Sequence, residues 1–71
     1  MTPAEKLQAL QADVPAFAGA GAEAVLAELP EWGSLTILLV VVHVEERHRL
    51  TLSGARIRAC RTVGDLLRLI P

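Results

Sequence analysis

The first stretch of the chain carries a helix start signal followed by apolar residues at helical spacing. Thr2, Pro3 and Glu5 form a capping-box sequence, with proline at the first helical position. Apolar residues follow three or four positions apart: Leu7, Leu10 and Val14. We expect a first helix from Pro3 to about Val14, ended by Pro15 because the residue before a proline is driven out of the helical conformation.

The last stretch repeats this arrangement. Thr62 is a good N-cap, and Asp65 follows three residues later. The apolar residues that follow the cap lie on one side of a helix: Val63, Leu66, Leu67 and Ile70. The pattern predicts a helix over Val63 to Ile70. Upstream of it, Ser53 is placed to cap a shorter helix that runs to about Cys60.

The segment after the first helix has few periodic apolar positions. Gly19 and Gly21 lie in a stretch from Ala16 to Ala24 that we interpret as a flexible connection. A short apolar patch then precedes Pro30: Val25, Leu26 and Leu29. This patch is long enough for a single helical turn.

The middle of the chain is its most apolar part, and local rules leave two interpretations of residues 35–44. Several of these residues are β-branched and favour a strand: Ile37, Val40, Val41, Val42 and Val44. A strand at 35–44 would pair with a segment near residues 50–52 and give a small α+β domain. A long helix has equal support from four apolar residues at i, i+3, i+4 and i+7: Leu35, Leu38, Leu39 and Val42.

The composition limits what such a chain can do. Its 71 residues suffice for a single small domain, 1–71, and its 52% apolar content favours a compact core over disorder. Phe17 and Trp32 are the only aromatic residues, so the core must be aliphatic. An interior this small leaves little room for a deep active site, and no constellation of side chains supports an enzyme.

The charges nearly balance, with eight acids against seven bases, so no overall field favours nucleic acid or an anionic membrane. The apolar run is about half as long as a bilayer-spanning helix, and His43 interrupts it. The N-terminal residues do not form a secretory signal, and the lone Cys60 fits a reducing compartment. We therefore expect a cytoplasmic protein that binds neither nucleic acid nor membrane.

Two further groups of side chains carry little chemistry. His43 and Glu46 have the spacing of metal ligands on one helix face, but two ligands do not make a site. Cys60 with His43 or His48 lacks a third group that would orient the base. We interpret Cys60 as a small apolar residue beside the last helix and expect a partly exposed His48.

Ser34 is the most informative polar residue, because it stands where a polar, Pro- and Gly-containing stretch meets the apolar run. A serine at this junction is either a helix N-cap or a point of covalent attachment. Three motifs bear on the choice: Trp32-Gly33-Ser34-Leu35, the pair Glu45-Glu46, and Thr62-Val63-Gly64-Asp65. Their order and separation resemble the acyl carrier protein family, over residues 29–70 without a gap.

The resemblance implies an all-α fold, a small four-helix bundle with a long loop between the first two helices. It implies that Ser34 carries 4′-phosphopantetheine, on which an acyl or aminoacyl group is held as a thioester for fatty-acid, polyketide or other secondary-metabolite biosynthesis. The implied partners are a phosphopantetheinyl transferase and a ketosynthase or an acyl or aminoacyl ligase, with the carrier a monomer and not itself an enzyme. Residues Leu35, Leu38 and Val42 would line the interior in which such chains shelter.

The resemblance also implies a partner-binding surface around the second helix. Its residues would be Trp32, Gly33, Leu35, Leu39, Val42, Glu45 and Glu46. Thr36 and Leu39 fall on early positions of this helix where the family usually carries acids, so we expect docking that is more apolar and less salt-sensitive.

Gly33 is a departure from the family pattern, because an aspartate usually precedes the modified serine. The change removes a carboxylate from the surface that a transferase contacts. Modification is then expected to be slow, to need a dedicated transferase, or not to occur. The alternative function is an interaction module that is not modified, built on a degenerate carrier fold or on the α+β sheet.

Overall fold

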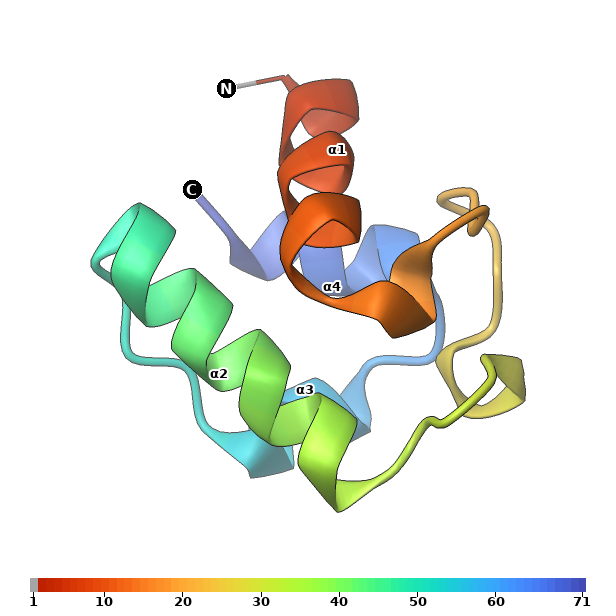
Figure 1. The fold of residues 1–71 in the computed structure, drawn as a ribbon. Coiled ribbons are helices and arrows are strands. Elements are labelled where there is room, and N and C mark those ends of the chain that lie inside the picture. Colours follow the sequence, from red (N-terminus) through yellow and green to blue (C-terminus); the bar gives the residue numbers. More distant parts are fainter. Residues whose placement is uncertain (1) are drawn as a thin grey trace.

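The computed structural model describes residues 2–71, which form four α-helices and two short 3₁₀ turns (Figure 1). In chain order these elements are α1 (Pro3–Asp13), η1 (Pro15–Phe17), η2 (Leu26–Glu28), α2 (Ser34–His48), α3 (Gly54–Ala59) and α4 (Val63–Leu69). Residues 2–71 contain no strand, only an isolated bridge between Val25 and Thr62. The all-α prediction is therefore confirmed, and the alternative α+β domain with a strand at 35–44 is wrong.

The helix boundaries follow the caps that the sequence predicts. Thr2 and Glu5 complete a capping box at α1, and Thr62 and Asp65 complete another at α4. Ser53 Oγ accepts the Arg56 amide at the start of α3. Each of these helices ends one residue earlier than predicted, where the backbone turns extended and the next amide still bonds back into the helix.

The connection from α1 to α2 is a long loop, but its beginning is not a flexible chain. In η1 the side chains of Ala16 and Phe17 are buried, and Phe17 packs edge-on against Trp32 with ring centroids 6.1 Å apart. The predicted helical turn near Leu26 is present as η2. Phe17 thus contributes an aromatic ring to an otherwise aliphatic core.

The end of this loop is hydrogen-bonded to the beginning of α4. The Gly64 amide donates to the Ala22 carbonyl at 2.7 Å, and the Val63 amide donates to the Ala24 carbonyl at 3.0 Å. The Leu26 amide donates to the Arg61 carbonyl at 2.9 Å. Because backbone polar groups need partners when they approach the core, these bonds fix the loop across the molecule.

Helix α2 is the longest element and crosses the front of the view in Figure 1, with α3 and α4 behind it. It packs against α1 and α3 through Ile37, Val40 and Val44. Three of the five β-branched residues that favour a strand locally are therefore buried on one helix face, where tertiary packing outweighs a weak local preference. The Cα radius of gyration is 10.5 Å, against about 11 Å for a compact chain of this length.

Candidate functional site

Ser34 is the first residue of α2 and is exposed. The N-cap position belongs to Gly33, whose extended backbone has φ 176° and ψ −167°, and no side chain within residues 2–71 caps this helix. The interpretation of Ser34 as an N-cap is therefore wrong. Its Oγ accepts a hydrogen bond from Arg58 Nη2 at 3.4 Å. The Ser34 hydroxyl makes no capping hydrogen bond at the helix start, and the residue is exposed to solvent.

The turn before α2 is held by the buried Thr36. Its hydroxyl donates to the Glu31 carbonyl at 2.7 Å, and Glu31 has a left-handed backbone with φ 61°. A non-glycine residue at positive φ is unfavourable unless its surroundings hold it there, and this hydrogen bond supplies one such constraint. Thr36 thus lies on the core side of α2. The resemblance to carrier proteins had implied a position on the partner-facing side.

The side of α2 that faces away from the core is apolar. Four large side chains have substantial exposure: Leu35 71%, Leu38 55%, Leu39 37% and Val42 43%. We call these residues the α2 apolar stripe. The prediction that Leu35, Leu38 and Val42 line the interior is wrong, because the opposite face of the same helix fills the core.

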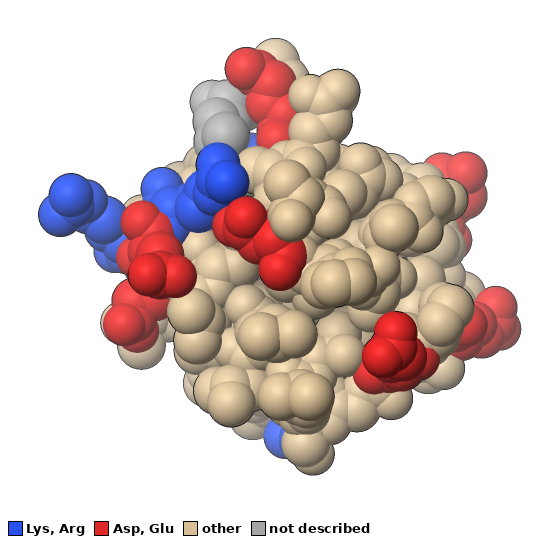
Figure 2. Space-filling view, in the orientation of Figure 1, with Lys and Arg blue, Asp and Glu red and all other residues tan. Residues whose placement is uncertain are grey.

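The stripe is continuous with an uncharged area of the surface. Figure 2 shows charged side chains gathered beside the C-terminal end of α2, and a broad tan area over its middle. Monomeric proteins expose single apolar side chains routinely, but four in one row form a patch. This patch begins at Leu35, directly after Ser34.

The other residues predicted to bind partners lie around this surface. Trp32 and Gly33 are half-buried at the entry to α2, and Glu45 and Glu46 are exposed near its other end. At 1.5 Å per helical residue, Ser34 and Glu46 are separated by about 18 Å along the axis. The structure therefore groups Gly33, Ser34 and Leu35, and leaves the Glu pair remote from them.

A cluster of polar side chains joins α1 to α2, and the sequence did not predict it. Asp13 Oδ2 accepts from Nδ1 of the buried His43 at 2.6 Å and from Arg47 Nε at 3.0 Å, while Oδ1 accepts from Arg47 Nη2 at 3.2 Å. The hydrogen bonds from Arg47 and then His43 lower the pKa of Asp13. The sequence shows that His43 and Arg47 are spaced i, i+4 and so share a helix face. Their partner, Asp13, comes from a distant part of the chain.

His48 lies beside this cluster, with its ring centroid 5.8 Å from that of His43. Burial lowers the pKa of His48, and electrostatic interaction with His43, Lys6 and Arg47 lowers it further. Among residues 2–71, Nε2 of each histidine is buried and has no hydrogen-bond partner. Residues 2–71 contain no group of three or more His, Cys, Asp or Glu side chains that could hold a metal ion.

Cys60 does not have the surroundings of a reactive thiol. Its Sγ lies 3.5 Å from the Arg56 carbonyl, to which it donates. Burial and the nearby Asp65 carboxylate raise the pKa of the thiol, although Arg56 opposes the change. Because the thiolate is the nucleophile, a raised pKa disfavours nucleophilic chemistry at this position.

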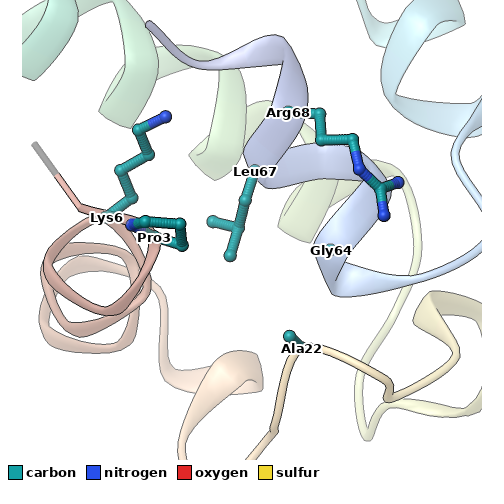
Figure 3. Close-up of a pocket in the computed structure, with 6 residues that line it drawn as sticks. All are labelled: Pro3, Lys6, Ala22, Gly64, Leu67 and Arg68. Carbon is teal, nitrogen blue, oxygen red and sulfur yellow. The ribbon is translucent and has the colours of Figure 1, made fainter.

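Ser34 lines neither of two pockets found among residues 2–71. The larger, of about 260 Å³, lies between α1, the long loop and the start of α4 (Figure 3), and is lined by Pro3, Lys6, Ala22, Gly64, Leu67 and Arg68. Its cations already have partners, since Lys6 Nζ donates to the Ile70 carbonyl and Arg68 Nη1 donates to Asp65. The smaller, of about 90 Å³, lies beside α2, where Leu35 and Leu39 meet Pro15 and Ala16.

None of the helices within residues 2–71 is long and apolar enough to cross a membrane. No protein-family model, no curated protein and no solved structure matches the sequence or the fold.

Proposed function

We propose that this chain is a carrier protein whose Ser34 receives a 4′-phosphopantetheine arm. The cargo would be an acyl or aminoacyl group, held as a thioester for fatty-acid, polyketide or other secondary-metabolite biosynthesis. The observation that carries the proposal is the exposed Ser34 hydroxyl on the first turn of α2, with no capping role and with exposed Leu35 next to it. A hydroxyl so placed can be reached by another enzyme without any unfolding of the domain.

The attachment step needs coenzyme A as donor and a transferase as catalyst. The Ser34 Oγ forms a bond to the phosphorus nearest the pantetheine group, and the bond from that phosphorus to the bridging oxygen of the diphosphate breaks. Adenosine 3′,5′-bisphosphate leaves with the electron pair, and the serine proton passes to a base of the transferase. The result is a phosphodiester on Ser34 and a free thiol at the far end of the arm.

The electrostatics of the helix start suit such a product. The amides of the first turn have no side-chain cap, because Gly33 has no side chain to offer. The N-terminal end of a helix carries a partial positive charge, and an anion beside it gains typically 0.3–1 kcal/mol. A singly charged phosphodiester on Ser34 would stand next to this end.

The α2 apolar stripe is the surface on which we expect partner enzymes to dock. A transferase must approach Ser34, and a ketosynthase or ligase must approach the arm attached there. Leu35, Leu39 and Val42 are exposed along the route, whereas the acidic residues of α2 lie near its other end. Docking on this surface would therefore be mainly apolar and only weakly sensitive to salt.

The experiment that tests the proposal is transfer from coenzyme A by a promiscuous phosphopantetheinyl transferase, followed by mass spectrometry. We expect the wild-type chain to gain one phosphopantetheinyl group and Ser34→Ala to gain none. Ser53→Ala is the matched control, since Ser53 is the other serine and caps α3. Modification of Ser34→Ala, or loss of modification in a folded Ser53→Ala, would argue against Ser34 as the site.

A second candidate is an interaction module that is never modified, and the exposed stripe is the observation that favours it. The two candidates differ in what Ser34→Ala does. A module would bind its partner equally well with alanine at this position, whereas a carrier would lose its cargo.

A further inference from the structure

Arg58 is the charged side chain that the fold brings to the Ser34 hydroxyl. It belongs to α3 and is 24 residues distant in sequence, yet its Nη2 lies 3.4 Å from Ser34 Oγ. Helices α2 and α3 pack against each other, so this contact lies between two fixed elements. The start of α3 is seated on α2, because a Cβ placed at Gly54 would lie 3.5 Å from Ile37 Cγ2.

The guanidinium of Arg58 extends back over the first turn of its own helix. A Cβ at Gly54 would lie 3.6 Å from Arg58 Nη1, while Nη2 points to Ser34. One nitrogen is therefore near the start of α3 and the other near the start of α2. The side chain spans the gap between the two helix starts.

The serine hydroxyl satisfies this cation poorly. A distance of 3.4 Å is long for a hydrogen bond to oxygen, and the hydroxyl is neutral. Within residues 2–71 the ion pairs are His43 with Asp13, Arg47 with Asp13, and Arg68 with Asp65, so Arg58 has no carboxylate partner there. An anion built on Ser34 Oγ would meet an arginine whose charge is not neutralised.

We propose that Arg58 binds the phosphodiester on Ser34 and so holds the first part of the arm against α3. This inference rests on the proposed function, because it needs the phosphodiester to be formed. The free oxygens of the phosphodiester would be bonded to the phosphorus attached to Ser34 Oγ, and so would lie within reach of the Arg58 guanidinium. A planar guanidinium can donate two parallel hydrogen bonds to such oxygens. Arg58 is then a positioning residue, since it acts on the arm and not on the reacting thioester.

Arg56 provides a matched control within the same helix. It has the same charge and is also exposed, but its charge acts on the Cys60 thiol, and the hydrogen bond to Ser34 comes from Arg58. Replacing either arginine by glutamine removes one positive charge from α3. Only Arg58→Gln removes the group that faces the phosphodiester.

The test is phosphorus NMR of the modified protein at low and high salt. We expect the wild-type phosphodiester resonance to shift when salt is added, because an exposed ion pair is screened. Arg58→Gln should show the high-salt position at low salt, with phosphorus relaxation that reports a more mobile arm. Arg56→Gln should match the wild type, and Arg58→Lys should restore part of the shift.

The outcomes separate this inference from the proposed function. A wild-type chain that gains no phosphodiester overturns both. A phosphodiester that forms, but whose resonance is insensitive to salt and unchanged in Arg58→Gln, overturns the role of Arg58 alone. A wild-type resonance that does not move with salt overturns the role of Arg58 without any variant, so this outcome does not depend on how well Arg58→Gln folds.

Discussion

Asp13, the last residue of α1, accepts a hydrogen bond at 2.6 Å from Nδ1 of His43 in α2. The His43 side chain is almost fully buried, whereas Asp13 is partly exposed. Arg47, one turn further along α2, binds the same carboxylate from the solvent side. The contact therefore satisfies a buried polar nitrogen and joins α1 to the middle of the longest helix.

Removal of the carboxylate should destabilise the fold more than removal of Arg47. In Asp13→Ala the buried His43 Nδ1 loses its acceptor, and a buried polar group without a partner is costly. Arg47→Ala removes only a partly exposed pair, which contributes little. Urea unfolding should give a lower midpoint for Asp13→Ala than for Arg47→Ala, and the reverse order would show that the buried bond does not stabilise the domain.

Stability should decrease as the pH falls below the ordinary histidine range. The folded state lowers the pKa of His48 from 6.5, so below pH 6.5 the unfolded chain binds a proton that the folded chain resists. The loss begins near pH 6.5 and continues until the lowered pKa is reached. Unfolding curves above about pH 5, where carboxylates remain ionised, isolate this effect. His48→Gln should have a shallower pH dependence there; an unchanged slope would exclude His48 as its source.

Gly33→Asp should stabilise α2. The Gly33 backbone is extended, and a Cβ at this position would meet nothing within 4 Å. An aspartate would cap the helix and reduce the freedom of the unfolded chain, for a gain of about 0.5–1 kcal/mol. Urea unfolding measures the gain. Under the carrier proposal the same variant should also accept phosphopantetheine faster than wild type, and a loss of stability would show that the helix start is not as open as described.

Gly64→Ala should destabilise the domain, whereas Gly54→Ala should not. A Cβ at Gly64 would lie 3.1 Å from the Ala22 carbonyl oxygen, which also accepts the Gly64 amide. The loop would have to move, at a cost on the order of 1–3 kcal/mol. At Gly54 the nearest atoms are 3.5 Å away, so alanine fits and should raise stability slightly. Equal effects in thermal unfolding would show that the loop does not depend on this close approach.

Local signals predicted most of the fold. The caps at Thr2, Ser53 and Thr62 act over three residues, so the sequence alone located the starts of α1, α3 and α4. The middle of the chain required more than propensity, because its β-branched residues favour a strand while their spacing favours a helix. The resemblance to carrier proteins favoured the helix, and the structure has it as α2.

Non-local contacts were beyond the sequence. The pattern of α2 is apolar on two sides, and nothing local shows that Ile37 and Val44 are covered while Leu35 and Leu38 are exposed. The contact between Arg58 and Ser34 likewise depends on how α3 packs on α2. The position of Ser34 at a helix start was predicted, but not that Gly33 would occupy the cap.

Fragmentation of the intact, transferase-treated protein is the most direct test of our proposal that Ser34 carries the arm. We expect one added phosphopantetheinyl group, located on Ser34 by the fragment masses and released as the pantetheine moiety on activation. A correctly folded chain that stays unmodified with several transferases, or that carries the group on any other residue, would contradict it.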